Sequence, residues 1–376
     1  MSSVRKIAEL AGVSITTVSR ALNNDPAVKP QTSKKVLRVA SRVGYVPSIG
    51  RRITTNIGFA YTQERTLTHP FDSAVMEGVV RGLDEHRFDL VIINVQRDKR
   101  PDESHAQFFL RKGLRGVILR TMAATRHVCC TIADSEFPHV VISEQFDAPN
   151  VNFIDGDSRH DSARAVEYLI SLGHRRIAFA MHTIPDRDHL DRFEGYREAL
   201  AKHQISLDEE IVFRYPFTLA GGGTVMEMLM SRGDRPTAVF LADPLLGVGA
   251  VKKAHEMGVR IPDELSVIGF DDTDMRHAVH PTLTAVCQNA NQLGYEASRW
   301  LVRAVTGATT EPLRKTIPTF FEINQSTAPP PTRLRRPANR GEQAIDGTTA
   351  LEQYGKTQGL GSRGVGRDAN IRSARP

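Results

Sequence analysis

The sequence predicts an N-terminal all-α helix-turn-helix domain followed by a bilobal α/β domain built on two doubly wound parallel sheets. Apolar residues recur at helical spacing through residues 4–43. From residue 56 onward, short β-branched apolar runs alternate with amphipathic stretches, a pattern typical of parallel sheets with helices on both faces. The alternation continues for about 270 residues, which exceeds a typical single domain and therefore indicates two lobes.

The head is expected to hold three short helices. Residues 4–11 and 15–22 have helical spacing and are separated by a turn at Gly12, and Ser14 stands at the N-cap position of the second helix. Pro30 is expected to open the third helix, because proline is favoured in the first helical turn. The predicted apolar stripe of this helix consists of Val36, Val39, Ala40 and Val43.

The α/β body contains a predicted alternation of strands and helices. Its apolar runs predict strands at residues 57–62, 90–95, 116–119, 139–143, 176–181, 238–242 and 265–270. Its amphipathic stretches predict helices at residues 71–86, 157–172, 191–203, 224–231 and 245–257. Ligands of such sheets bind beyond the carboxyl ends of the strands, and a cleft between lobes is a favoured place. We therefore expect a ligand site between the two lobes.

The composition is that of an ordinary globular protein of 376 residues, with 40% hydrophobic and 24% charged residues. No apolar run is long enough to span a bilayer, and the first residues lack the apolar stretch of a secretion signal. The three cysteines, Cys129, Cys130 and Cys287, suggest no disulfide framework. We therefore expect a protein of the reducing cytoplasm.

Positive charge is concentrated at the two ends of the chain. Residues 1–52 hold ten lysines and arginines against two acidic residues, and residues 328–376 hold nine against four, whereas the body between them is net acidic. A basic head on an acidic body indicates that the head meets a polyanion, although a solvated surface bias would give the same balance. The final segment is rich in Pro, Gly, Ser and Gln, which predicts a disordered tail.

Residues 7–23 carry the strongest functional signal. The sequence there is Ile-Ala-Glu-Leu-Ala-Gly-Val-Ser-Ile-Thr-Thr-Val-Ser-Arg-Ala-Leu-Asn, which predicts a helix, a tight turn and a second helix of short polar side chains. Such a helix can approach DNA closely, with hydroxyl groups and its positive N-terminus turned toward phosphates. The alternative is a small polar helix pair that binds no nucleic acid.

This run closely resembles the helix-turn-helix of the LacI/GalR repressor family, above all in Val13-Ser14 and in Thr17-Val18-Ser19-Arg20. The resemblance implies that three side chains contact base edges: Ile15, Thr16 and Arg20. It also implies that four polar side chains hold phosphates: Ser14, Thr17, Ser19 and Asn23. One position departs from the family, because Lys29 precedes Pro30 where the family usually has a serine cap. We therefore expect a more weakly capped third helix.

The body resembles the same family through residue 327, in residues 172–178, 192–196, 267–272 and 281–288. In the family this body has the fold of periplasmic sugar-binding proteins, with the effector held between two hinged lobes. The resemblance thus implies a sensing role for the body. The chain is accordingly divided into a DNA-binding domain (1–47), a shortened hinge (48–55), an effector-binding and dimerisation domain (56–327) and a tail (328–376).

The resemblance also implies which side chains contact the effector: Phe71, Asp188, Arg192, Phe217, Asp243, Asp271 and Gln288. Arg192 would present a forked donor to ligand oxygens, and Asp271 would accept hydroxyl groups from the opposite lobe. The alternatives are a structural ion pair for these two residues and ordinary core packing for Phe71 and Phe217. The family often has Asn-Asp where this chain has Ala242-Asp243, which leaves the identity of the effector open.

The hinge differs most from the family pattern. It is several residues shorter than usual and lacks the family's Ala-Arg-x-Leu helix. Gly50 would weaken a helix there by about 1 kcal/mol relative to alanine. Arg51 and Arg52 are still expected to reach phosphates or a narrow minor groove. We therefore predict that this protein bends its operator less than its relatives do.

Several patterns that suggest catalysis are incomplete. Residues 246–249 lack the third glycine of a dinucleotide-binding loop, and residues 221–224 lack the lysine of a phosphate-binding loop. His277 and His280 have metal-ligand spacing, but exposed loop histidines explain them better. We therefore expect no enzyme, no cofactor and no metal. The rival classes are a sugar-metabolising enzyme with a DNA-binding head and an exported solute-binding protein.

The sequence as a whole predicts a homodimeric transcriptional repressor that binds a pseudo-palindromic operator in double-stranded DNA. One recognition helix contacts too few base pairs for specificity, and two-fold symmetric proteins match symmetric sites. A small-molecule effector, expected to be a sugar or sugar derivative, would close the lobes and shift the population between two arrangements of the heads.

Overall fold

The computed structural model describes residues 4–23, 25–43, 45, 54–62, 68–184 and 186–332. Most of the predicted hinge, including Arg51 and Arg52, lies outside the described residues, as does the tail beyond residue 332.

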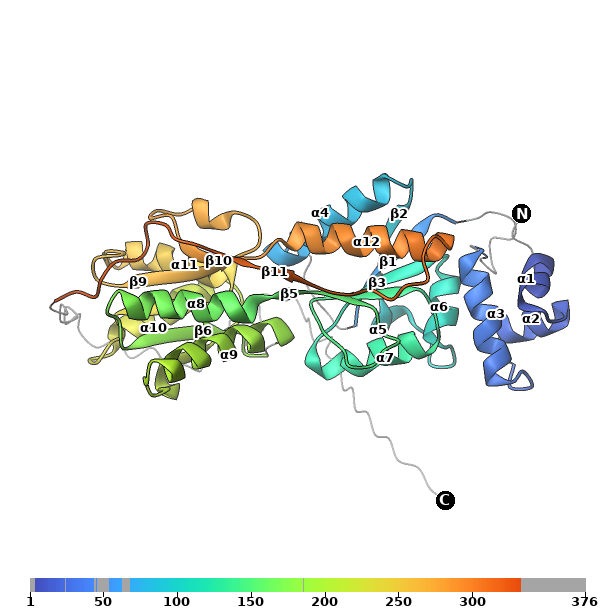
Figure 1. Ribbon diagram of the computed structural model, residues 1–376, viewed down its shortest axis with the longest axis horizontal. Helices are drawn as coiled ribbons and strands as arrows, with labels where there is room; N and C mark the ends of the chain where they lie inside the picture. Colours follow the sequence, from blue (N-terminus) through green and yellow to red (C-terminus); the bar gives the residue numbers. More distant parts are fainter. Residues whose placement is uncertain are drawn as a thin grey trace, which may run out of the picture. The chain divides into compact units, whose positions relative to one another are not determined.

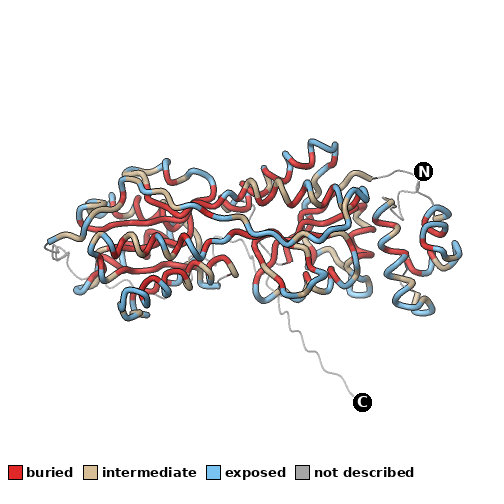
Figure 2. The backbone as a smooth tube through the Cα atoms, in the orientation of Figure 1, coloured by how far each residue is buried: buried red, intermediate tan, exposed pale blue. Residues whose placement is uncertain are grey.

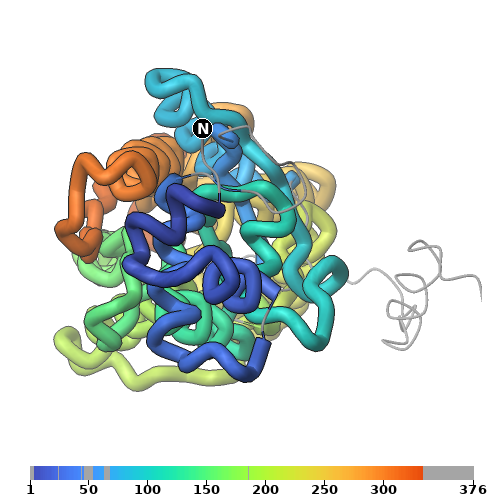
Figure 3. Tube along the Cα trace, turned by 90° about the vertical axis from the view of Figure 1, so that its right-hand side faces the viewer, coloured from blue at the N-terminus to red at the C-terminus, as the bar shows by residue number. Residues whose placement is uncertain are grey.

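Three helices form the head, as predicted: α1 (Val4–Ala11), α2 (Ile15–Leu22) and α3 (Pro30–Arg42). The three helices lie side by side (Figure 3). They pack around fully buried apolar side chains that include Ile7, Ala11, Val18 and Val36. Helix α2 begins after Ser14, whose Oγ accepts a hydrogen bond from the Thr17 amide at 3.0 Å. Helix α3 begins at Pro30 without a side-chain cap, because the Lys29 side chain makes no capping hydrogen bond.

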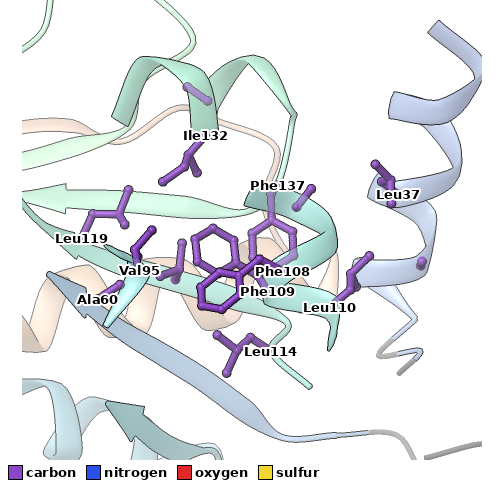
Figure 4. Packing of buried hydrophobic residues seen from close by; sticks show 14 of the residues in the cluster. Leu37, Ala60, Val95, Phe108, Phe109, Leu110, Leu114, Leu119, Ile132 and Phe137 are labelled. Atoms are coloured by element: carbon purple, nitrogen blue, oxygen red, sulfur yellow. The ribbon is translucent and has the colours of Figure 1, made fainter. Parts of the chain in front are cut away.

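Of its predicted apolar stripe, the third helix buries Val36 and Ala40, whereas Val39 and Val43 are half-buried. Leu37 and Ser41 are also buried, because α3 packs against the first lobe of the body as well as against the head. Leu37 and Leu110 belong to one buried cluster (Figure 4). The Ser41 hydroxyl donates to the backbone oxygen of Arg115 at 2.6 Å. Helical periodicity within the head cannot reveal this second contact.

The first lobe holds a parallel sheet of six strands in the order β11-β5-β4-β3-β1-β2. The strands are β1 (Asn56–Tyr61), β2 (Asp89–Asn94), β3 (Gly116–Arg120), β4 (His139–Ile142), β5 (Phe153–Asp157) and β11 (Arg314–Pro318). Helices α4 (Pro70–Asp84) and α12 (Ala290–Thr306) cover one face, and α6 (His105–Arg111) and α7 (Arg126–Asp134) cover the other (Figure 1). Short helices α5 (Val95–Asp98) and η1 (Ala123–Thr125) lie in connections.

The second lobe repeats this plan with the strand order β12-β10-β9-β8-β6-β7. The strands are β6 (Ile177–Met181), β7 (Val212–Arg214), β8 (Ala238–Leu241), β9 (Ser266–Asp271), β10 (Thr284–Cys287) and β12 (Phe320–Glu322), of which β12 alone pairs antiparallel. Helices α8 (Ser158–Ser171) and α9 (Arg187–Lys202) cover one face, and α10 (Leu219–Ser231) and α11 (Pro244–Glu256) cover the other. Single turns η2 (Glu209–Ile211) and η3 (Met275–His277) complete it.

The predicted strands and helices of the body are confirmed, with differences at their ends. Helices α9 and α10 begin earlier than predicted, because Asp186 and Thr218 cap them: the side chains accept from the His189 and Gly221 amides at 3.2 and 2.9 Å. The sequence prediction missed five strands (β5, β7, β10, β11 and β12) and four helices (α5, α6, α7 and α12). Strand β5 has the polar sequence Phe-Ile-Asp-Gly-Asp, which no apolar run marks.

The central strands of both sheets are buried between their helix layers, whereas the edge strands β2, β11 and β12 are partly exposed (Figure 2). The chain crosses between the lobes where β5 leads into α8, where β10 leads into α12, and where β11 leads into β12. Strand β5 leaves the first sheet at its carboxyl end, and β10 leaves the second sheet in the same way. The carboxyl ends of the two sheets therefore face the crossings, which is where the ligand site was expected. No helix in the described residues is both long and apolar enough to cross a membrane.

Candidate functional site

The candidate DNA-binding face is the outer side of α2. Val18 and Ala21 point into the head, whereas the side chains of Ser14, Ile15, Thr16, Ser19, Arg20 and Asn23 are exposed. Thr17 is half-buried, and its hydroxyl lies 2.8 Å from that of Ser14. The helix has no acidic residue in its first turn, so no negative side chain opposes a phosphate at its N-terminus.

Arg20 makes a weak local contact with Asp25. Its Nε lies 3.5 Å from Asp25 Oδ2, and 57% of its side chain is exposed. An exposed pair of this kind contributes little stability and is easily broken. The guanidinium is therefore available to a DNA base without a large cost.

A second candidate site lies at the carboxyl ends of both sheets, where Arg192 and Asp188 point inward from α9. Both side chains are buried. Arg192 Nη1 donates to the backbone oxygen of Ala242 at 2.8 Å, and its guanidinium lies 3.4 Å from the ring centre of Phe270. Arg192 Nε and Asp188 Oδ1 have no hydrogen-bond partner. Such buried polar atoms are costly unless a ligand or water pairs with them.

Gln288, which follows β10, is a third buried side chain with unpaired polar atoms. Neither Oε1 nor Nε2 has a hydrogen-bond partner. The side chain lies against Gly156 in β5, where an added Cβ would approach Oε1 to 2.9 Å. Gln288 thus connects the end of the second sheet to a strand of the first.

Asp272, which was not among the predicted site residues, is a further carboxylate on which the charge of Arg192 acts. It is buried, and its Oδ1 has no partner. Burial raises the pKa of Asp272 to about 7, although the positive charges of Arg192 and His69 act to lower it. The sequence contains the adjacent pair Asp271-Asp272, but only Asp271 was predicted to contact the effector.

Asp271 has a local structural role in this structure. Oδ1 accepts hydrogen bonds from the amides of Thr273 and Met275, and Oδ2 accepts from the Arg276 amide at 3.1 Å and from its Nη1 at 2.8 Å. The ion pair that was the alternative for Asp271 is therefore present, with Arg276 as its partner in place of Arg192. The loop after β9 owes its shape to this carboxylate.

Asp243 joins the two lobes. Its Oδ1 caps α11 by accepting from the Leu245 and Leu246 amides, and its Oδ2 lies 2.9 Å from Nε2 of His69, the residue before α4. Burial opposes protonation of His69, but the hydrogen bond and charge of Asp243 outweigh it and raise the pKa of this histidine. His69 was not among the predicted residues, because it lies far from Asp243 in sequence.

The two predicted aromatic walls have different surroundings. Phe217 is half-buried among the rings of His189, His182 and His69, at centre distances of 4.4, 4.5 and 6.0 Å. Phe71 is buried in the first turn of α4, with the Arg120 guanidinium 4.5 Å from its ring centre. Phe217 therefore keeps ring surface that a ligand can reach, whereas Phe71 packs largely against protein.

Asp155 brings a further buried carboxylate from β5. It accepts from Gln145 Nε2 at 2.9 Å and from the Gly156 amide at 2.8 Å. Burial raises its pKa, in spite of hydrogen bonds that include one with Asp188. Asp188 has its pKa raised by burial and by the charges of Asp155 and Asp186. The predicted residues Asp188, Arg192 and Gln288 thus belong to one acidic, buried polar cluster with Asp155 and Asp272.

Two family models and several known proteins are similar to this chain. Residues 3–48 match the family model of bacterial regulatory proteins of the lacI family, and residues 166–327 match that of periplasmic binding protein-like domains. The regulator CelR of Thermobifida fusca is 29% identical over 333 residues, 86% of this chain and 98% of that protein. The ribose operon repressor of Haemophilus influenzae is 29% identical over 310 residues, 81% of this chain and 92% of that protein.

The chain belongs to the LacI family of bacterial regulatory proteins. Two solved structures show its fold. A complex of CelR with cellobiose has a TM-score of 0.63 at 29% identity and covers 87% of this chain and 100% of that chain. A LacI-family regulator from Enterococcus faecium with bound ribose has a TM-score of 0.64 at 26% identity, covering 73% of this chain and 99% of that chain.

LacI-family members are transcription regulators and not enzymes, and the structure explains the glycine runs that suggested catalysis. Gly222 lies inside α10, and Gly249 lies inside α11. A Cβ on Gly222 would come within 2.3 Å of the Leu246 oxygen, and one on Gly249 within 2.1 Å of the Leu219 oxygen. These glycines let two helices pack closely. Among the described residues, no three His, Cys, Asp or Glu side chains are arranged to hold a metal ion.

Proposed function

We propose that this protein is a homodimeric repressor whose operator binding is controlled by a polyhydroxy effector, a sugar or sugar derivative, bound in the polar cluster between the lobes. The observation that carries the effector part is the set of unpaired polar atoms on Asp188, Arg192, Asp272 and Gln288. Carboxylate oxygens need donors, the Arg192 Nε needs an acceptor, and the Gln288 amide needs both. A hydroxyl group supplies both functions, so a sugar suits this set.

The proposed contacts come from the second lobe, and Asp155 of β5 adds a carboxylate from the first lobe. Asp188 and Arg192 come from α9, Asp272 follows β9, and Gln288 follows β10, while Phe217 offers a ring face. Asp243 and Phe71 would support the site through His69 and Arg120, and Asp271 would shape its loop. Two relatives support the choice of ligand, because solved LacI-family structures contain cellobiose and ribose.

The DNA part of the proposal rests on the exposed face of α2. Ile15, Thr16 and Arg20 would contact base edges, and Ser14, Thr17, Ser19 and Asn23 would hold phosphates. Arg51 and Arg52 of the hinge would add minor-groove or phosphate contacts. A dimer on a two-fold symmetric site doubles the contacted base pairs. As a regulator of transcription, the protein would work in the cytoplasm.

Effector binding would act by shifting a population. A sugar that pairs with groups from both lobes binds the closed arrangement better than an open one, so it favours closure by that difference in affinity. Because α3 contacts the first lobe through Ser41 and Arg115, a movement of that lobe would carry the head with it. The operator affinity would change as a result.

The test begins with DNA selection. The full chain is used to enrich duplexes from a random pool, and the winning duplex is then titrated in the presence of a panel of sugars. We expect two-fold symmetric sites and at least one sugar that changes the operator Kd. Selection without an enriched motif would refute the DNA part, and an operator Kd that no sugar changes would refute the effector part.

A further inference from the structure

The carboxyl end of β4, in the first lobe, carries a buried hydroxyl group on Ser143, the residue that follows the strand. The proposed effector contacts come from the second lobe, with Asp155 added from the first. We infer that Ser143 is a specificity-determining residue of the effector site, and that its Oγ forms a hydrogen bond with one hydroxyl group of the sugar. This inference rests on the proposed function and deepens it, because it names how the first lobe selects the sugar.

The Ser143 hydroxyl has no hydrogen-bond partner in the structure. The residue is 1% exposed, and Oγ itself is buried. A serine hydroxyl can donate one hydrogen bond and accept two, and its burial without a partner costs stability. In the same lobe, the hydroxyls of Ser73 and Ser135 donate to backbone oxygens at 2.9 and 2.6 Å. The Ser143 hydroxyl therefore has its whole hydrogen-bonding capacity available to a ligand.

The backbone at Ser143 is held in a conformation that serine rarely adopts. Its φ of 59° lies in the left-handed region, which is unfavourable for a residue with a Cβ. The amide donates to the Ile154 oxygen at 2.9 Å, so pairing with β5 holds the residue in place. Three other residues with positive φ, Arg87, Glu136 and Gln204, follow the ends of helices, where this conformation is common. Ser143 follows a strand, and strained residues of this kind are concentrated at ligand sites.

The two residues that follow this serine connect the segment to the polar cluster. Gln145 Nε2 donates to Asp155 Oδ2 at 2.9 Å. Glu144 is buried, and its charge interacts with that of Asp155 and with those of Asp186 and Arg187, at the start of α9 in the second lobe. The segment after β4 therefore lies where the first lobe faces the second.

Ser143 and Arg192 thus contact the effector from opposite lobes. Arg192 Nε is a donor and needs an acceptor, whereas the serine hydroxyl can fill either role. The contact with Ser143 forms as the lobes close over the sugar, so the burial of Oγ in this arrangement does not exclude it. A site that pairs a buried protein group with a ligand hydroxyl rejects the analogue that lacks this hydroxyl, because the protein group is then left unpaired. Ser143 accordingly distinguishes a sugar from one of its deoxy analogues.

The experiment combines deoxy sugars with a variant of the full chain. D-Glucose, D-galactose, D-ribose and cellobiose are screened by titration calorimetry, and the sugar that binds most tightly is compared with its monodeoxy analogues. We expect one monodeoxy analogue to bind the unmodified chain about tenfold more weakly than the parent sugar does, and Ser143→Ala to bind the parent sugar about tenfold more weakly. The same analogue should bind Ser143→Ala about as tightly as the parent sugar does, because the hydroxyl pair is already lost.

Two further variants separate recognition from folding. Ser143→Gly also removes the hydroxyl but suits the left-handed backbone, so it should weaken sugar binding as Ser143→Ala does and unfold at a higher Tm than Ser143→Ala. Ser298 is the matched control, a buried serine of the same lobe whose Oγ donates to the Tyr295 oxygen of its own helix at 2.9 Å. Ser298→Ala should leave the Kd of the sugar unchanged.

The outcomes distinguish a failure of this inference from a failure of the proposed function. If a sugar binds and changes the operator Kd, but Ser143→Ala binds it normally, only the inference fails. Strict additivity of the variant and the deoxy change for every analogue would overturn it as well, because no sugar hydroxyl would then pair with Ser143. If no sugar binds the full chain or changes its operator Kd, the proposed function itself fails.

Discussion

His69 and Asp243 form a hydrogen bond of 2.9 Å between the two lobes. His69 is the residue before α4 in the first lobe, and Asp243 caps α11 in the second. The carboxylate is 1% exposed and the imidazole 21% exposed, so solvent screens this pair only partly. The contact therefore links this arrangement of the lobes to the protonation of one histidine.

This link predicts a pH dependence of stability. The pKa of His69 in the folded protein is raised above its usual value, so the stabilisation from the pair is fully present below about pH 6.5 and is lost as the pH rises through the folded-state pKa. We expect His69→Gln to lower the Tm more at about pH 5.5 than at about pH 8.5. Thermal unfolding at several pH values measures this.

The exposed His160 provides a matched control, since His160→Gln changes a histidine away from this contact. Its Tm should follow that of the unmodified chain at every pH. A loss of Tm in His69→Gln that is constant across the pH range would show that the protonated pair does not stabilise the lobes.

The contact between the head and the first lobe predicts a coupled loss of stability. Arg115 Nη2 donates to the backbone oxygens of Arg42 at 3.1 Å and of Val305 at 2.8 Å, while Ser41 Oγ donates to the Arg115 oxygen. Arg115→Ala removes the donor of both bonds, of which the one to Val305 is buried, and should lower the free energy of unfolding by about 1–3 kcal/mol. Denaturant unfolding gives this value.

Ser41→Ala addresses the same contact from the head side. Since both changes break one contact, the double variant should lose less than the sum of the single losses. Arg197→Ala, whose side chain is 50% exposed, is the control and should change stability little. Strict additivity of the two losses would mean that the head and the lobe are not coupled at this point.

Much of the fold could be predicted from the sequence because its strands are apolar and its helices amphipathic. Strand β1 and helix α11 follow these patterns closely. Strand β5 does not, because its buried Asp155 and its Asp157 belong to the crossing between the lobes and break the apolar run. The helices and strands that the sequence prediction missed lie mainly at the crossings between the lobes. The residues there meet the needs of both lobes, so they do not follow the pattern of a simple strand or helix.

The site was less predictable, because separate strand ends build it. Asp188 and Arg192 share one helix, and their spacing of one turn was visible. His69 and Asp243 are far apart in sequence, and only the fold pairs them. In the pair Asp271-Asp272, the direction of each side chain depends on the loop after β9, in which Arg276 takes the first carboxylate. Sequence alone does not reveal which of the two remains for the ligand.

The uncapped start of α3 predicts a stabilising substitution. Lys29 has extended backbone angles, φ −55° and ψ 139°, and makes no side-chain capping bond. A serine there can accept a hydrogen bond from an amide of the first turn, so Lys29→Ser should raise the stability of the head by about 0.5–2 kcal/mol. Thermal unfolding followed by circular dichroism measures it. Lys29→Ala, which removes the same charge without adding a cap, should give no such gain; an equal gain would attribute the effect to charge.

Arg20 is predicted to recognise sequence in addition to adding charge. Its exposed guanidinium on α2 can pair with a base edge, and such a bidentate contact is worth about 1–3 kcal/mol. Arg20→Ala should therefore weaken binding of the selected operator by that amount and leave binding of random duplex nearly unchanged. Fluorescence anisotropy with both duplexes distinguishes the two roles. Equal losses on both would make Arg20 a phosphate contact.

The central claim is that the buried polar cluster controls the affinity of the head for DNA. The measurement that tests it most directly is the operator Kd of the full chain with and without an effector sugar, for the unmodified protein, Asp188→Asn and Asp263→Asn, a control in an exposed position of the same lobe. We predict that the sugar changes the Kd of the unmodified protein and of the control about tenfold or more. Asp188→Asn should keep the sugar-free Kd and lose the response. A normal response in Asp188→Asn would contradict the account.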